Sequence, residues 1–297
     1  MAQPLLSRLK QTGGAIDVLA PEWVAPVVRR MPEVSHVIST PFRHGPLALR
    51  ARWRLGRALR EHGYQNAIVL PNSWKSALVP FFAGIPVRTG YVGEMRYGLL
   101  NALHRSTGAP MPEHYARLAG DGARELGRAH LETTKNEVAE AMRKFGIATR
   151  YTVLCPGAEY GPAKRWPYFR ELAERLGSPV VIIGSAKDAE AAAHVPGLNL
   201  VGRTSLDEAI CLIAGAQAVV SNDSGLMHVA AALGRPQVAL FGSSSPEHTP
   251  PASRAARVLW LRLECSPCFE RECPLGHFRC MKDLSPEAVL AEVRSLS

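Results

Sequence analysis

Long hydrophobic runs are missing from this 297-residue sequence. No stretch approaches the roughly 20 apolar residues that cross a bilayer, and no segment of the signal-peptide kind follows Met1. Low-complexity tracts and internal repeats are also missing, which excludes a disordered chain and a solenoid. The composition, with 46% hydrophobic and 21% charged residues, is typical of a folded globular protein. These features predict a folded cytoplasmic protein without a membrane-spanning helix.

Acidic residues are scarce near the start of the chain, where residues 1–60 hold ten Lys or Arg against three Asp or Glu. The formal net charge of the whole chain is +9. Five arginines lie in a segment with a helical pattern, 47–64: Arg50, Arg52, Arg54, Arg57 and Arg60. They form either a solvated helix face or a surface that attracts a phosphorylated substrate, a lipid surface or nucleic acid. Because no RNA-binding, helix-turn-helix or zinc-finger pattern accompanies the charge, we expect no nucleic-acid partner.

Short apolar runs rich in β-branched residues alternate with helical patterns. The runs are 15–20, 66–71, 151–157, 179–185, 216–223 and 235–244. Their nearly continuous hydrophobicity is typical of strands buried on both faces of a parallel sheet. Helical patterns at 168–177 and 205–216 lie between them, and Ser205 with Glu208 has the spacing of a capping box. The alternation predicts doubly wound α/β units.

The strongest candidate for a domain boundary follows an amphipathic helix at 131–146, closed by Gly146. Residues 106–120 before this helix are predicted to form an irregular connection. We therefore expect two domains, 1–148 and 149–297, with a ligand-binding cleft between them.

The segment SNDSGLMHVAAALGRP, residues 221–236, joins a predicted strand to a predicted helix. Asp223, Ser224 and His228 have the residue types of a hydrolytic triad, but no GxSxG elbow surrounds the serine. A second reading is that Asp223 or Ser224 caps the helix and His228 is simply buried. The third is an anion site, in which the helix N-terminus attracts a phosphate and Gly225 lets it approach the backbone.

Two further loops after predicted strands favour the anion site. One, within 155–176, is rich in Gly and Pro and carries Lys164 and Arg165; the other is GSAKD, 184–188. Two cations at a strand end suit a diphosphate, although the loop is not a Walker A motif. Because the carboxyl ends of parallel strands share one edge of a sheet, the three loops together predict a nucleotide-diphosphate pocket.

Long motifs spread over nearly the whole chain carry a family resemblance. They are PGAEYGPAKRWP, GSAKD, GRTSLDEA, SNDSGLMHVAAALGRPQVALFGSSSPEHTPP, PNSWKSALVPFFAGIPVRTGY, GEMRYGLLN and CSPCFERECPLGHFRC. They resemble the ADP-heptose:lipopolysaccharide heptosyltransferases of glycosyltransferase family 9, most closely the heptosyltransferase II branch. The resemblance implies an α/β fold of the GT-B type, with two Rossmann-like doubly wound domains facing a central cleft.

The same resemblance implies an inverting transfer of L-glycero-D-manno-heptose from ADP-heptose to the first heptose of heptosyl-Kdo-lipid A. No cofactor would be required. The enzyme would act peripherally at the cytoplasmic face of the inner membrane, in contact with a lipid A-linked acceptor. The alternatives are a catalytically impaired nucleotide-sugar-binding protein of the same fold and a related heptosyltransferase with another acceptor.

By position, the resemblance also implies a set of binding residues. Those for the donor are Ala158, Glu159, Lys164, Lys187, Thr204, Asp223, Ser224, Gly225 and His228. Lys164 would meet the diphosphate, and Lys187 and Thr204 would lie towards the adenosine. Candidates for the acceptor are Asn72, Ser73, Lys75 and Arg88, of which Lys75 and Arg88 are predicted to lie in loops.

One part of the family pattern has no counterpart here. In the family, a first strand, a glycine-rich loop and an aspartate, the candidate general base, precede the segment that resembles MAQPLLSRLK. Neither Asp17 nor Glu22 occupies the place of that aspartate, so the resemblance implies that it lies upstream of Met1. We expect general-base catalysis to be about 10²–10⁴-fold weaker without it.

Four cysteines cluster near the end of the chain. Cys265, Cys268, Cys273 and Cys280 have the spacing C-x2-C-x4-C-x6-C, with His277 between the last two. In a cytosolic protein, clustered thiols favour a metal over a disulfide, but this spacing is not that of a zinc ribbon. We expect reduced, partly buried thiols, with structural zinc or iron as the alternative. Cys155 and Cys211, in apolar patterns, are expected in the core.

Overall fold

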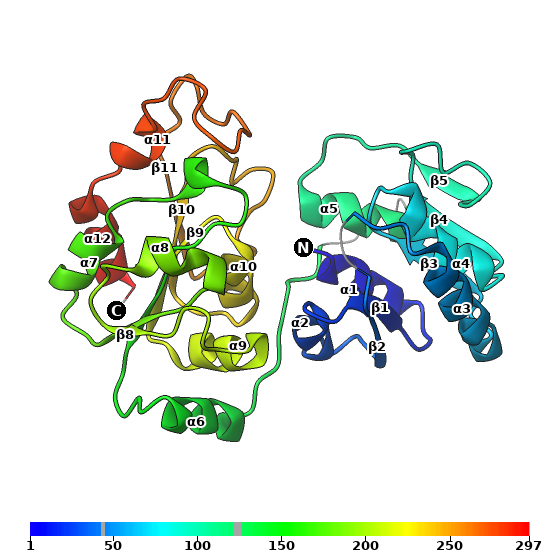
Figure 1. Ribbon diagram of the computed structural model, residues 1–297, viewed down its shortest axis with the longest axis horizontal. Helices are drawn as coiled ribbons and strands as arrows, with labels where there is room; N and C mark the ends of the chain where they lie inside the picture. Colours follow the sequence, from blue (N-terminus) through cyan, green and yellow to red (C-terminus); the bar gives the residue numbers. More distant parts are fainter. Residues whose placement is uncertain (43–44, 121–125, 297) are drawn as a thin grey trace.

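The structure is a computed structural model that describes residues 1–42, 45–120 and 126–296. Two groups of elements stand side by side, which we call the first half (1–120) and the second half (126–296) (Figure 1). Within the described residues, every strand pair is parallel, as the nearly continuous apolar runs predicted.

The second half is built on one six-stranded sheet with the order β11-β10-β9-β6-β7-β8. Its strands are β6 (Thr152–Cys155), β7 (Val180–Ile182), β8 (Leu198–Asn199), β9 (Ala218–Asn222), β10 (Gln237–Phe241) and β11 (Ala256–Trp260). Read from β8 to β11, this is the doubly wound order 3-2-1-4-5-6, which reverses between β6 and β9. A ligand is therefore expected at the carboxyl ends of these two strands.

Helices cover both faces of this sheet. They are α6 (Lys135–Lys144), α7 (Phe169–Arg175), α8 (Ala189–Ala192), α9 (Leu206–Gly215), α10 (Gly225–Ala232), α11 (Arg279–Lys282) and α12 (Pro286–Ser295), with short 3-10 helices η4 (Pro162–Lys164) and η5 (Ala186–Asp188). One core joins α7 and α12 through Phe169 and Val289. The other joins α6, α9 and α10 through Ala141, Ile210 and Val229. Burial on both faces confirms the doubly wound arrangement predicted here.

The first half contains two smaller sheets. One pairs β1 (Asp17–Pro21) with β2 (His36–Thr40), and the other has the order β3-β4-β5, with β3 (Asn66–Val69), β4 (Val87–Tyr91) and β5 (Ala102–His104). Its helices are α1 (Gln3–Gln11), α2 (Ala25–Arg29), α3 (Leu49–Leu59), α4 (Leu78–Phe82) and α5 (Met111–Ala116), with 3-10 helices η1 (Arg60–His62), η2 (Trp74–Ala77) and η3 (Arg117–Ala119). The arginine-rich segment thus forms α3, as its pattern predicted.

Two predicted elements need correction. Part of the stretch 106–120, expected to be irregular, forms α5, which begins just after Pro110. Helix α6 begins at Lys135, later than predicted, because Thr134 caps it in a capping box with Glu137. By contrast, Ser205 and Glu208 form the capping box predicted for α9.

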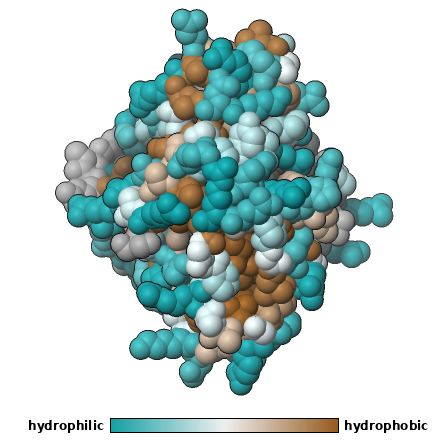
Figure 2. Space-filling model, turned by 90° about the vertical axis from the view of Figure 1, so that its left-hand side faces the viewer, coloured by the Kyte–Doolittle hydropathy of each residue, from teal (hydrophilic) through white to brown (hydrophobic). Residues whose placement is uncertain are grey.

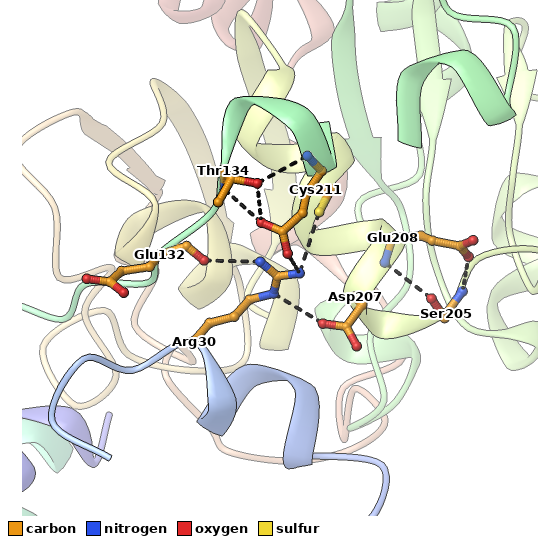
Figure 3. Close-up of polar contacts among 8 residues, drawn as sticks. Arg30, Glu132, Thr134, Ser205, Asp207, Glu208 and Cys211 are labelled. Atoms are coloured by element: carbon orange, nitrogen blue, oxygen red, sulfur yellow. Dashed lines mark hydrogen bonds and ion pairs between the residues drawn. The ribbon is translucent and has the colours of Figure 1, made fainter. Parts of the chain in front are cut away.

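Arg30, at the end of α2, ties the first half to the second. Its guanidinium donates to Glu137 Oε1 and Asp207 Oδ1, each at 3.1 Å, and to the main-chain oxygen of Glu132. Figure 3 shows this side chain reaching from α2 towards α6 and α9. Burial disfavours its charge, but the two carboxylates prevail and raise the pKa of Arg30. Val27 and Met31, on either side of Arg30 in sequence, pack against the core of the second half, so the junction is both charged and apolar.

A cavity of about 790 Å³ lies at this junction and is lined by Arg30, Glu132, Asp207 and Arg235 among others. None of the binding residues predicted from the sequence lines it. The predicted boundary at 148/149 stays a prediction. Just before it, α6 packs against α9 within the core of the second half.

Within the described ranges, no helix has the length and apolar character needed to cross a bilayer. The face of the second half that points away from the first is mainly hydrophilic, with a hydrophobic band in its lower part (Figure 2).

Candidate functional site

The six-stranded sheet brings Lys164 and Asp223 together at the point where its strand order reverses. Lys164 ends η4, in the loop after β6, and Asp223 directly follows β9. The lysine Nζ lies 2.5 Å from Asp223 Oδ2, and the two side chains are 15% and 6% exposed. Ser244, after β10, donates its hydroxyl to the same carboxylate oxygen at 2.6 Å. A nearly buried ion pair thus occupies the place where this fold binds ligands.

The N-terminus of α10 opens at the same edge. Ser224 occupies the N-cap position, but no side chain of the described residues caps the helix, since the Ser224 hydroxyl lies 3.1 Å from that of Ser221. The capping predicted for Asp223 or Ser224 is therefore wrong. The first-turn N–H groups, left without a side-chain cap, and the positive end of the helix dipole favour an anion.

Asn222, which the sequence analysis did not single out, fixes the two loops to each other. Its side-chain amide donates to the main-chain oxygen of Pro156 at 2.8 Å and accepts from the Trp166 N–H at 3.1 Å. Both partners lie in the loop after β6. The residue was within the quoted motif, but a buried asparagine at a strand end has no sequence signal of its own.

His228, one turn into α10, has an imidazole that stays neutral near pH 7. Burial lowers its pKa to about 4, and the N-terminal ammonium of Met1 and the Lys164 ammonium act in the same direction, while Asp223 opposes them. A neutral ring can donate one hydrogen bond and accept another, which suits contact with a sugar hydroxyl. Among the described residues, the Ser224 hydroxyl lies next to that of Ser221, and the Asp223 carboxylate accepts from Lys164 and Ser244, so neither is hydrogen-bonded to His228 as a hydrolytic triad requires.

The low pKa of His228 predicts a specific loss of stability in acid. The unfolded imidazole takes up a proton near pH 6.5 and the folded one only near pH 4, so its contribution is complete above pH 6.5 and declines towards pH 4. We expect this residue to account for about 2 kcal/mol of the fall in unfolding free energy between pH 7 and pH 5. Urea unfolding of the original chain and of His228→Gln at pH 7 and pH 5 measures this contribution, and the variant should lose less stability in acid. An unchanged pH dependence in the variant would contradict the assignment.

The loop after β7 closes a second side of the site. Lys187 Nζ pairs with Glu159 Oε1 at 2.8 Å, and both side chains are largely exposed. Asp188 anchors the loop by accepting from the main-chain N–H and the hydroxyl of Ser185, each at 2.8 Å. A Cβ on Gly157 would lie 2.2 Å from the Asp188 carboxyl carbon, so only glycine lets the loops after β6 and β7 approach this closely.

The other predicted donor residues are distributed around this edge. Ala158 is buried, directly before Glu159. Thr204 lies after β8, in the loop whose Gly202 N–H donates to Gly184 O at 3.0 Å. The structure therefore places the predicted donor residues in loops or a helix start that follow β6, β7, β8 and β9 of one sheet.

The cysteine-rich segment supports the loop that carries Lys164. The Ala163 N–H donates to Arg271 O at 3.0 Å, and the Tyr160 hydroxyl donates to Phe269 O at 2.5 Å. The Tyr160 ring lies 5.0 Å from the Lys164 ammonium and 5.3 Å from the Arg271 guanidinium carbon. This segment thus contributes to positioning Lys164.

The thiols of this segment have unlike environments. Burial, together with the neighbouring Cys268, Cys265 and Cys273, raises the pKa of Cys280 to about 11. At Cys273, burial acts against ionisation, but main-chain N–H groups directed at its sulfur lower its pKa. In the described part of the chain, no three His, Cys, Asp or Glu side chains are arranged to hold a metal ion. Cys155 and Cys211 lie in the core, as predicted.

Three of the four acceptor candidates lie together at the carboxyl edge of the β3-β4-β5 sheet. Asn72, Ser73 and Lys75 all follow β3, and Lys75 Nζ donates to Gly45 O at 2.9 Å. The buried Arg96, missed in the sequence, holds this edge by donating to Pro71 O, Asn72 Oδ1 and Tyr91 O.

Arg88 lies elsewhere. It belongs to β4 and not to a loop, and it pairs with Ala67 near the start of β3, so its predicted loop position is wrong. Its guanidinium donates to the main-chain oxygens of Ile85 and Leu99, each at 2.6 Å. These bonds give Arg88 a structural role in closing the loop that precedes β5.

Solved structures with the same arrangement define the class of fold. The structure of the Escherichia coli ADP-heptose lps heptosyltransferase II matches with a TM-score of 0.88 and 42% identity, covering 99% of this chain and 93% of that one. The E. coli heptosyltransferase WaaC with ADP matches with a TM-score of 0.72 and 20% identity, covering 100% of this chain and 95% of that one. At this identity the match shows a shared fold alone. The protein is thus an α/β protein of the GT-B class.

Sequence comparison narrows the class to one family. The family model Glycosyltransferase family 9 (heptosyltransferase) matches residues 52–279. Lipopolysaccharide heptosyltransferase 2 of E. coli K12 is 45% identical, and the match covers 95% of this chain and 89% of that protein. Lipopolysaccharide heptosyltransferase 2 of Salmonella typhimurium LT2 is 44% identical, and the match covers 100% of this chain and 94% of that protein. The chain belongs to glycosyltransferase family 9 and is a glycosyltransferase, which confirms the resemblance drawn from its motifs.

Proposed function

We propose that this chain transfers L-glycero-D-manno-heptose from ADP-heptose to the first heptose of heptosyl-Kdo-lipid A. The observation that carries the proposal is the Lys164–Asp223 pair beside the uncapped N-terminus of α10, where the strand order reverses. A cation and free main-chain N–H groups at one point suit a nucleotide diphosphate. The close relatives are lipopolysaccharide heptosyltransferases, which supports heptose as the transferred sugar.

In this proposal the donor binds to residues 149–297. Lys164 donates to the diphosphate, and the N–H groups after Ser224 stabilise the charge that develops on the departing ADP. His228 contacts the sugar as a neutral ring, and Lys187 and Thr204 lie towards the adenosine. The acceptor hydroxyl gives its proton to a carboxylate base and attacks the anomeric carbon from the face opposite ADP. The new C–O bond forms as the bond to the ADP oxygen breaks, so that the configuration inverts and ADP departs. In this proposal no cofactor takes part.

The acceptor binds to residues 1–148 in the same proposal. Asn72, Ser73 and Lys75 share one sheet edge, and Lys75 supplies a cation for an acceptor phosphate or carboxylate. Because the acceptor is linked to lipid A, the enzyme works peripherally at the cytoplasmic face of the inner membrane.

Gly225→Ala tests the donor site with little disturbance to the fold. Gly225 is exposed, and an added Cβ would meet no atom within 4 Å. We expect stability to change by less than about 1 kcal/mol, because alanine favours a helix. The methyl group would, however, occupy the space in which a phosphate approaches the N–H groups, and ADP affinity should fall about tenfold or more.

Isothermal titration with ADP-heptose, alongside thermal unfolding, measures both effects. Gly177→Ala is the matched control, because its Cβ is also unobstructed but Gly177 lies in the turn between α7 and β7. If Gly225→Ala bound ADP-heptose as tightly as the control, the donor would not lie at the start of α10.

A further inference from the structure

Large apolar side chains are exposed mainly in the first half. Among the described residues these are Leu19, Trp23, Leu47, Leu49, Trp53, Trp74, Phe81, Val87, Val92, Met95, Tyr97 and Leu103. Those in the second half are Leu126, Tyr160, Val258, Leu261, Phe269 and Leu275. The outer face of the second half is correspondingly mostly hydrophilic (Figure 2). Apolar exposure of this density marks an interaction surface more often than a solvated one.

Helix α3 combines exposed apolar side chains with exposed arginines. It packs against α4 through Gly56, where a Cβ would lie 2.5 Å from Phe82 Cβ, and through the buried Leu59. The exposed side, which we call the α3 face, consists of Leu49, Trp53 and Arg57, spaced four residues apart along the helix, with Arg50 and Arg54 next to them; Leu49 borders the packed side. Leu49 and Trp53 are 46% and 47% exposed, and the Arg57 guanidinium carbon lies 5.3 Å from the Trp53 ring.

The charge on the α3 face is not balanced. No ion pair joins Arg50, Arg54 or Arg57 to an acidic group of the described chain. On α7, by contrast, Arg170 pairs with Glu174 one turn along. A helix face with apolar groups between unpaired arginines is complementary to a surface that is anionic outside and apolar beneath.

The loop that leads into α3 contacts the proposed acceptor edge. Lys75, in η2, donates to the oxygen of Gly45, in the loop that leads into α3. Trp74, next to it in η2, has an exposed side chain, and its main-chain N–H donates to Glu94 Oε2 at 2.9 Å. The start of α3 is thereby held next to the elements that would receive the acceptor.

We propose that the α3 face rests on an anionic lipid bilayer. Arg50, Arg54 and Arg57 contact lipid phosphates, and Leu49 and Trp53 enter the boundary between headgroups and acyl chains. This inference rests on the proposed function, because an acceptor linked to lipid A brings the protein to a bilayer. It deepens that function by naming the surface that meets the lipid. Nucleic acid fits less well, because its phosphates attract arginines but give Leu49 nothing to bury against.

Co-sedimentation with vesicles tests the inference without any sugar substrate. The vesicles contain equal parts of phosphatidylglycerol and phosphatidylethanolamine, and phosphatidylcholine vesicles serve as the uncharged reference. Each arginine near an anionic surface contributes roughly a fivefold gain in partitioning, so R50E/R54E/R57E should bind about 100-fold or more weakly than the original chain. Trp53→Ala, which keeps the charge, should bind about tenfold more weakly.

The matched control is R143E/R150E/R294E, which reverses three exposed arginines of the second half. It should retain binding within a few-fold, and circular dichroism should show all variants folded. The inference is overturned if the original chain prefers neither vesicle, if the control loses as much binding as the α3 variant, or if Trp53→Ala has no effect. The last result would favour nucleic acid. Because no ADP-heptose is present, failure of the transfer reaction would leave this result unchanged.

Discussion

Lys164→Ala is expected to lower the free energy of unfolding by about 3 kcal/mol and the affinity for ADP-heptose about 100-fold. Among the described residues, the substitution leaves the Asp223 carboxylate, 6% exposed, with only the Ser244 hydroxyl as a side-chain partner. Removing one member of a buried ion pair costs about 3–5 kcal/mol. The variant also lacks the cation that meets the diphosphate, and the unpaired carboxylate repels it. Urea unfolding and isothermal titration measure the two effects.

Two companion variants separate stability from binding at this position. Lys187→Ala breaks an exposed pair with Glu159 and should change stability by less than about 1 kcal/mol. Lys164→Met combined with Asp223→Leu replaces the buried pair by apolar groups and should recover most of the lost stability without recovering ADP-heptose binding. Unaltered donor affinity in Lys164→Ala would show that this lysine does not meet the diphosphate.

Gly157→Ala is expected to destabilise the protein by about 3 kcal/mol and to weaken donor binding as well. The new Cβ would lie 2.2 to 2.5 Å from all three carboxyl atoms of Asp188, a group already fixed by two hydrogen bonds to Ser185. Because this carboxyl group is fixed, the overlap can be relieved only if the loops after β6 and β7 move apart. Since Lys164 and Lys187 are carried by these loops, their spacing should change too.

Thermal unfolding and ADP-heptose titration of Gly157→Ala check this result against Gly177→Ala, whose Cβ meets no atom within 4 Å. The control should unfold within about 1 kcal/mol of the original chain. A Gly157→Ala protein as stable as the control would show that the two loops are not packed as closely as described.

Buried elements were the most predictable part of the fold. Strands β6, β9 and β10 are buried along their whole length, so their sequences are mainly apolar and stand out. Strand β11 has two exposed positions among its five residues, and β8 has only two residues, so neither leaves a strong periodic signal. Helix α5 was missed because it has only six residues and includes Pro112.

The donor site was predictable because its parts follow strands of one parallel sheet. Once β6, β7 and β9 are recognised, Lys164, Lys187 and Asp223 must share an edge. The contacts between them were not predictable, because the pairing of Lys164 with Asp223 spans 59 positions of sequence. Arg88 was misplaced for a related reason: an arginine within a five-residue strand has no local signal that distinguishes it from a loop residue. The general base, which the resemblance places before Met1, stays a prediction.

Transfer of heptose to a defined acceptor tests the central claim most directly. The chain is incubated with ADP-heptose and heptosyl-Kdo-lipid A, and the acceptor is analysed by mass spectrometry while released ADP is quantified. The account predicts one added heptose per acceptor, an equal amount of ADP, and a large loss of both in Lys164→Ala. An acceptor that gains no heptose, from a chain that also shows no saturable binding of ADP-heptose, would contradict it.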